Sequence, residues 1–233
     1  MKRLLWIVFL TTSVLHAQNV AFKKLIDSSP LDTKLATLTD SEQKESGVML
    51  RHQLYVEYTF DSLGQLSCLQ GIVKRIRIND SKAIEMYNKI VLPVPNTNDL
   101  IYLKARSISK NGTVKEVGME AVKELEEQGR VYKILAVEGL EIGGELEYTT
   151  LFRRSSSLFG GEILQSDIPV RKVEVKIITP AYLQFEAKVY NAPATISSDT
   201  LNEKRTISVG LQNLSPIYEE KYANLKANLI RLN

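Results

Sequence analysis

The sequence is poor in the residues from which metal centres and nucleophilic sites are built. Its 233 residues include one cysteine, Cys68, one tryptophan, Trp6, and two histidines, His16 and His52. A lone cysteine excludes an internal disulfide. Zinc and related metals need several clustered His, Cys or carboxylate ligands, which this composition does not supply. We therefore predict no disulfide, no metal site and no bound cofactor.

The sequence also lacks an apolar run long enough to cross a membrane. The N-terminal run Leu4–Leu10 follows Lys2 and Arg3 and precedes a short stretch that ends in Ala17. This order is typical of a secretory signal peptide, and the run is too short to span the ~30 Å of a hydrocarbon core. We predict a signal peptide over residues 1–17, no stable membrane anchor, and a periplasmic or secreted bacterial protein.

A strong excess of one charge is absent as well. The chain carries 30 Lys and Arg against 27 Asp and Glu, a net charge of +3, and loss of Lys2 and Arg3 with the signal peptide brings it close to +1. Nucleic-acid-binding domains are usually strongly basic. The charge therefore argues against a nucleic-acid partner.

No glycine-rich phosphate loop is present. The pairs Gly143-Gly144 and Gly160-Gly161 lack the G-x-G-x-x-G or G-K-S/T context, and we interpret both as turns. Four basic residues flank the second pair, and they form either a small anion-attracting patch or, as we favour, a scattered solvated face. They are Arg153, Arg154, Arg171 and Lys172.

A Cys-His pair would be the sharpest catalytic hypothesis, because an imidazole can activate a thiolate. If a hairpin places Phe60 opposite Leu66, Cys68 lies opposite Tyr58, six residues along the strand from His52. At ~3.3 Å per residue the separation is ~20 Å, far beyond hydrogen-bond reach. We therefore predict no catalytic residue in this chain and interpret both side chains as part of the core.

Alternation of apolar and polar residues dominates the chain after residue 47. It is clearest over Val48–Phe60 and continues after a turn over Leu66–Ile78. The predicted fold is all-β, an antiparallel β-sandwich or a large twisted sheet with one or two short helices. Further strands are expected at Lys89–Val94, Leu100–Val117 as a hairpin turning at Asn111-Gly112, Val131–Val137, Leu146–Phe152, Val170–Ile178, Tyr182–Tyr190, Arg205–Leu211 and Ala227–Leu232, with a short helix at Ser81–Tyr87; 119–128 is left undecided.

The domain plan follows from this pattern. A polar lead-in segment (residues 18–47) precedes a β-sandwich domain (48–212), and a linker or edge segment (213–233) follows. The strand Ala227–Leu232 stops without a turn, which predicts an unpaired edge and weak self-association through it.

The stretch from Val131 to Phe152 organises the prediction. Val131–Val137 reads as a central strand covered on both faces, and a glycine-containing reversal leads to a second strand. On that second strand Glu145 and Glu147 occupy the face opposite Leu146, which predicts a solvated strand face. Their Cα atoms are ~6 to 7 Å apart, so a glycan-processing carboxylate pair is an alternative.

Three phrases together resemble a known family. They are Y-L-K-A-R-S-I-S-K-N-G-T-V at 102–114, Y-K-I-L-A-V-E-G-L-E-I-G-G-E-L-E-Y at 132–148 and L-Q-S-D-I-P-V at 164–170. They are similar to the domain of unknown function that precedes a transglutaminase-like core in exported bacterial proteins. The family-motif positions, to which the resemblance gives a structural role, are Ala105, Gly112, Gly143, Glu147, Tyr148, Gln165, Pro169 and Val170.

The resemblance implies a function without a catalytic residue of its own. Family members usually continue into a domain with a Cys, His and Asp triad, and the sequence ends at Asn233 before such a set. The expected role is a non-catalytic exported β domain that binds or positions a protein or cell-envelope substrate. Its expected partners are a transglutaminase-like domain or protein, or a cell-envelope protein or glycan. Two alternatives are the front portion of a transglutaminase-like peptidase or acyl transferase, and a carbohydrate-active or carbohydrate-binding protein.

Overall fold

The computed structural model describes residues 32–60, 63–92, 99–127, 130–157, 160–217 and 228–233. The predicted signal peptide and most of the lead-in segment lie outside these ranges. Within them the chain is built mainly of strands, so the predicted all-β class is confirmed. No helix of the described ranges has the length and apolar character needed to cross a membrane.

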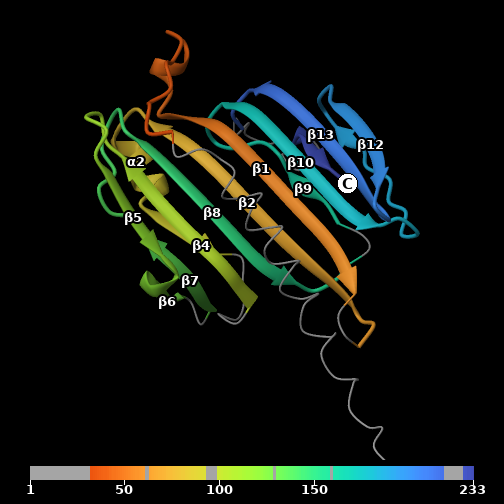
Figure 1. Ribbon diagram of the computed structural model, residues 1–233. Coiled ribbons are helices and arrows are strands. Elements are labelled where there is room, and N and C mark those ends of the chain that lie inside the picture. Colours follow the sequence, from red (N-terminus) through yellow and green to blue (C-terminus); the bar gives the residue numbers. More distant parts are fainter. Residues whose placement is uncertain (1–31, 61–62, 93–98, 128–129, 158–159, 218–227) are drawn as a thin grey trace, which may run out of the picture. The chain divides into compact units, whose positions relative to one another are not determined.

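The largest sheet, sheet A, has eight strands in the order β12-β13-β10-β1-β2-β8-β4-β5 (Figure 1). Neighbouring strands pair antiparallel except β1 and β10, which pair parallel, so the antiparallel prediction fails at this one pair. The strands are β1 Gly47–Phe60, β2 Leu66–Ile78, β4 Leu100–Ile108, β5 Val114–Gly118, β8 Glu145–Arg154, β10 Val170–Pro180, β12 Thr195–Leu201 and β13 Lys204–Leu214.

Two small sheets cover one face of sheet A and lie behind it in Figure 1. Sheet B has the order β3-β7-β6 and sheet C the order β11-β14-β9. The strands are β3 Lys89–Leu92, β6 Val122–Glu127, β7 Arg130–Ala136, β9 Glu162–Ile163, β11 Val189–Tyr190 and β14 Arg231–Leu232. The helices are α2 Ser81–Tyr87 and the 3-10 helices η1 Glu42–Lys44 and η3 Met119–Ala121.

In sheet A strands such as β1, β2 and β10, the period of two places one side of the strand in a common core. In the β1–β2 hairpin Phe60 pairs with Leu66 and Tyr58 with Cys68, as predicted. Buried side chains of sheet A, such as Leu54, pack in one cluster with Leu135 of sheet B and Leu232 of sheet C. The covered face is thus the apolar face, as expected from the hydrophobic effect.

The glycine-containing reversal connects two layers. β7 is the central strand of sheet B, as predicted, but Leu135 is buried while its neighbour Ala136 is exposed, so the predicted cover on both faces is incomplete. β8 belongs to sheet A. Gly143 has φ +84 in the connection, a value that glycine adopts without strain. The Gly143 N–H donates to the Ile78 carbonyl at 2.6 Å, and the Ile78 N–H donates to the Gly144 carbonyl at 3.0 Å. These bonds anchor the connection to the end of β2.

Two predictions for the C-terminal third are wrong. Tyr182–Tyr190 forms a paired strand only at Val189–Tyr190, while the exposed strand β12 was not predicted. β14 is paired on both sides, with β11 and β9. Leu229, Ile230 and Leu232 are buried. The unpaired edge at this strand does not exist, so self-association through it loses its structural basis.

Candidate functional site

A charged cluster lies on the face of sheet A opposite the core. Glu145 has a side chain with no exposed area. Its Oε2 accepts from Arg75 Nε at 2.5 Å, and its Oε1 accepts from Arg77 Nη2 at 2.7 Å and from the Ala36 N–H at 2.7 Å. The predicted solvated face is therefore wrong for Glu145, because neighbouring arginines and the lead-in segment enclose the carboxylate.

Glu147 belongs to the same cluster. Strand register places Arg51, Arg75, Glu147 and Arg106 side by side across β1, β2, β8 and β4. The Glu147 carboxylate pairs with Arg51 at 3.1 Å and with Arg106 at 2.8 Å, one oxygen to each. Both oxygens of each glutamate are therefore occupied by donors. This arrangement is suited to joining strands and leaves no carboxylate pair open to a glycosidic bond.

The arginines of this face also hold the backbone of the lead-in segment. Arg75 Nη2 donates to the Lys34 carbonyl at 2.8 Å and Arg77 Nη2 to the Ala36 carbonyl at 2.5 Å. Arg171 Nη2, on β10, donates to the Thr37 carbonyl at 2.6 Å. Side chains from two strands of sheet A thus bind the main chain of a non-helical peptide segment. Local pattern reasoning missed this contact because its partners are about 40 or more residues apart.

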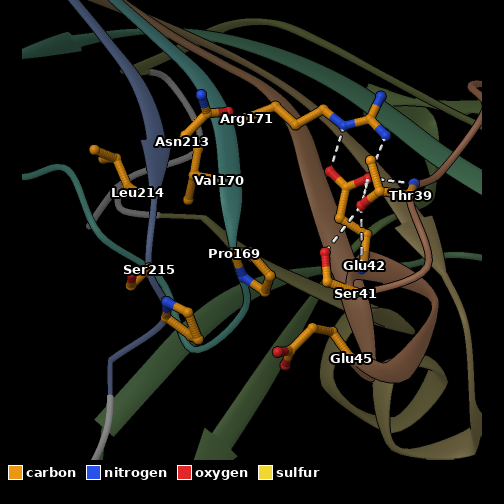
Figure 2. Close-up of a pocket in the computed structure, with 11 residues that line it drawn as sticks. Thr39, Ser41, Glu42, Glu45, Pro169, Val170, Arg171, Asn213, Leu214 and Ser215 are labelled. Atoms are coloured by element: carbon orange, nitrogen blue, oxygen red, sulfur yellow. Dashed lines mark hydrogen bonds and ion pairs between the residues drawn. The ribbon is translucent and has the colours of Figure 1, made fainter.

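A pocket of about 360 Å³, which we call the lead-in pocket, opens beside this segment (Figure 2). Figure 2 shows Arg171 extended toward Glu42, whose carboxylate it contacts with Nε at 2.5 Å and Nη2 at 2.6 Å. The lining residues are Thr39, Ser41, Glu42, Glu45, Pro169, Val170, Arg171, Asn213, Leu214, Ser215 and Pro216.

Glu42 is fixed from both sides. Its Oε2 accepts from the Thr39 N–H at 2.8 Å, and the Glu42 N–H donates to Thr39 Oγ1 at 3.3 Å. This reciprocal pair is a capping box, which the T-D-S-E sequence specifies. Hydrogen bonding from Arg171 lowers the Glu42 pKa to about 2. Glu42 thus serves as a permanent anion that anchors the pocket wall.

A second pocket, the β14 pocket, lies on the covered face and has a volume of about 490 Å³. Tyr58 and Phe185 stack there with ring centroids 4.8 Å apart. At its polar end Arg154 Nη1 contacts Glu162 at 3.1 Å and donates to Gln70 Oε1 at 2.5 Å. The lining residues are Val56, Tyr58, Arg154, Gly160, Gly161, Glu162, Ile177, Phe185, Glu186, Leu232 and Asn233. A volume of this size is typical of ligand pockets.

Cys68 and His52 lie at different positions along the β1–β2 ladder. Cys68 is opposite Tyr58 and Arg154, and burial raises the pKa of its thiol. His52 is opposite Lys74, and burial, aided by the Lys74 charge, lowers the His52 pKa to about 3. The described ranges contain no group of three or more His, Cys, Asp or Glu side chains placed to hold a metal.

The four basic residues flanking the Gly160-Gly161 pair do not form one patch. Arg154 lies in the β14 pocket and Arg171 in the lead-in pocket, each paired with a glutamate. Lys172 pairs with Glu174 at 2.8 Å, and Arg153 is exposed on β8.

The family-motif positions fall mainly on strands and turns. Ala105 has no exposed area and pairs with Tyr148 across β4 and β8. Gly112 has φ +84 in the predicted β4–β5 turn. Gln165 accepts from the Ile230 N–H at 2.9 Å and donates to the Ser215 carbonyl at 3.2 Å. The structure places Pro169 and Val170 together in the lead-in pocket and Glu147 in the charged cluster.

Comparisons with known proteins identify the domain. The family described as a domain of unknown function with a solved structure, DUF3857, matches residues 72–218. A crystal structure from Parabacteroides distasonis, named a "putative protease", is 15% identical with a TM-score of 0.68, covering 80% of this chain and 39% of that one. A two-domain M1 zinc metallopeptidase bound to tryptophan is 10% identical with a TM-score of 0.41, covering 80% of this chain and 42% of that one. A search of curated proteins finds no match.

The likeness to the Parabacteroides structure, at 15% identity, concerns the fold alone. The chain spans 39% of the length of that protein.

Proposed function

The chain belongs to the DUF3857 family of β-rich domains, and from this premise we propose that it is a non-catalytic domain of an exported bacterial protein that binds and positions a polypeptide. The polypeptide is the substrate of, or part of, a peptidase or acyl-transferase domain of the transglutaminase-like type. Polypeptide binding by this domain would assist catalysis by the other, because a domain that holds a polypeptide raises the local concentration of that polypeptide beside the catalytic site.

One observation carries the proposal. Arg75, Arg77 and Arg171 bind three carbonyls of the lead-in segment through their guanidinium groups. Backbone carbonyls are common to every peptide, so this mode of contact is independent of peptide sequence. The segment is part of the same chain, and its contacts support the view that this face can hold non-helical main chain.

The groups that would support catalysis have structural partners instead. Glu145 and Glu147 are each held by two arginines. Cys68 is buried and lies six residues from the position opposite His52. These placements support a binding role over hydrolysis or acyl transfer by the domain itself.

One experiment distinguishes a binding domain from an enzyme. The probe is fluorescein-labelled, reduced and carboxymethylated α-lactalbumin, which is an unfolded polypeptide. We expect saturable binding by fluorescence anisotropy and an intact probe on a gel after prolonged incubation. Cleavage or cross-linking that disappears in Cys68→Ala or Glu145→Gln would show an enzyme, and absence of any binding would remove the proposed function.

A further inference from the structure

A row of polar side chains crosses the covered face of sheet A. Strand register places His52 of β1 opposite Lys74 of β2, and Lys74 opposite Tyr148 of β8. The three strands are neighbours in the middle of the sheet (Figure 1). On β2 Lys74 lies between Ile72 and Ile76, which pack in or against the core. The period of two therefore directs the Lys74 side chain to the covered face as well.

These three side chains lack polar partners within the described part of the chain. Among those residues the side chains of His52, Lys74 and Tyr148 form no hydrogen bond, and Lys74 forms no ion pair. Each is half-buried, so a ligand group can reach it. Burial lowers the pKa of Lys74, and no carboxylate of the described residues opposes this effect. The charged form of Lys74 thus has no counter-charge on an apolar face.

Thr150 adds a fourth polar group. It lies two residues from Tyr148 on the same face of β8, is opposite Ile72 and is 2% exposed. Its Oγ1 is buried without a hydrogen-bond partner among the described residues. Thr150 is a diagonal neighbour of Lys74, a distance that a long side chain can reach. Buried polar groups in folded proteins are nearly always paired, so several unpaired groups in one place point to a polar ligand.

The chemistry of these groups defines the class of ligand. An ammonium group and hydroxyl groups donate hydrogen bonds to an anion. One lysine balances one negative charge, which favours a carboxylate over a doubly charged phosphate ester. The surroundings are apolar, because Val173 pairs with His52 on β10 and Phe152 follows Thr150 on the same face of β8, and both are buried. A carboxylate attached to an apolar body suits both the charge and the surroundings.

We propose that Lys74, with the hydroxyl groups of Tyr148 and Thr150 beside it, binds the carboxylate of an apolar organic acid or of a polypeptide C-terminus on the covered face of sheet A. The ammonium pairs with the carboxylate, and the apolar body packs against the neighbouring core residues. The anion offsets the cost of burying an unpaired charge. This site is on the opposite face of sheet A from the charged cluster, so it stands independently of the proposed function.

Two carboxylate probes distinguish the two sources by isothermal titration calorimetry. Octanoate represents a free organic acid, and acetyl-Leu-Val-Leu with a free C-terminal carboxylate represents a polypeptide end. Their uncharged counterparts are octanol and the amidated tripeptide. We expect saturable binding of at least one carboxylate probe and about tenfold or more weaker binding of its counterpart, because hydrogen bonds between charged groups are lost. The probe that binds more tightly identifies the source. Binding of neither carboxylate, or equal binding of a carboxylate and its counterpart, would overturn the proposal.

Lys74→Met keeps the length of the side chain and removes its charge. We expect it to bind the carboxylate probe about tenfold or more weakly than the wild type. The matched control is Lys176→Met, the same change at an exposed position of β10, which should alter binding by less than about twofold. Unchanged binding by Lys74→Met, or an equal loss in both variants, would contradict the assignment to Lys74.

Two further measurements separate binding from folding. Because an unpaired buried charge destabilises a fold, Lys74→Met should melt at or above the wild-type temperature in circular dichroism. In the wild type, a saturating concentration of the carboxylate probe should slow acetylation of Lys74 by acetic anhydride and leave Lys176 unaffected, as measured by peptide mass spectrometry. A marked fall in the melting temperature, or no protection of Lys74, would show that the ammonium serves the fold and would overturn the proposed site.

Discussion

Removal of the Glu145 charge should destabilise the domain strongly. Glu145→Gln keeps the shape of the side chain but leaves Arg75 and Arg77 without their counter-charge. Breaking a buried ion pair on one side costs ~3 to 5 kcal/mol. Both arginines keep a carbonyl partner, at Lys34 and Ala36, which favours the lower end of that range. We therefore expect a loss of about 3 kcal/mol of unfolding free energy at pH 7.

Urea denaturation followed by far-UV circular dichroism measures this loss. With an m-value of about 2 to 3 kcal/mol/M, the midpoint should fall by about 1 to 1.5 M, and the melting temperature by about 6 to 12 °C. Glu116→Gln is the matched control on the same sheet. Its ion pair with Lys104 is exposed and should contribute ~0 to 1 kcal/mol. Equal, small effects of the two substitutions would refute the reasoning that the enclosed cluster joins the strands.

Three further predictions concern the titration of Glu42, the titration of His52 and the N-terminus of the exported protein. Because the Glu42 pKa is lowered to about 2, its stabilisation is present above the unfolded pKa near 4.5 and is lost as pH falls through 2; Glu42→Gln should cost ~1 to 3 kcal/mol at pH 7 and nothing below pH 2 in denaturation curves. The His52 pKa is lowered to about 3, so between pH 6.5 and 3 only the unfolded state takes up a proton on His52, and the free energy of unfolding decreases as the pH is lowered through this range. His52 ring signals that shift between pH 8 and 5 in NMR would contradict this. Exported protein should begin near Gln18 and lack tryptophan, and an intact mass that includes Met1 would disprove the signal peptide.

Strands whose pattern has one buried face were predictable. In β1 and β2 several apolar residues meet across the ladder, as at Phe60 and Leu66 and at Leu54 and Ile72, so local alternation and tertiary packing agree there. The β4–β5 hairpin was predictable as well, because Gly112 supplies the φ > 0 position of its turn. In both hairpins, the turn and the alternating residues next to it in the sequence are enough to predict the strand pairing.

Three features depend on partners distant in the sequence and were not predictable from local pattern. β7 and β8 are adjacent in the chain, yet alternation does not state that they belong to different sheets. Glu145 is polar by sequence, and its burial requires Arg75, Arg77 and the lead-in segment together. β14 has two ladder residues, too few for a periodic signal.

The family-motif positions and the pockets give complementary information about function. On β8 neighbouring motif residues face opposite ways: Glu147 joins the charged cluster, while Tyr148 is half-buried and packs against the core opposite Ala105. A bulky residue at position 105 would compete with the Tyr148 ring for the same space. Ala105, Glu147 and Tyr148 therefore determine how β4 and β8 pack, and they do not indicate a chemical activity. The residues that line the β14 pocket, such as Phe185 and Arg154, lie outside the motif. Differences in binding among such domains should therefore be sought in the residues that line the β14 pocket rather than in the motif.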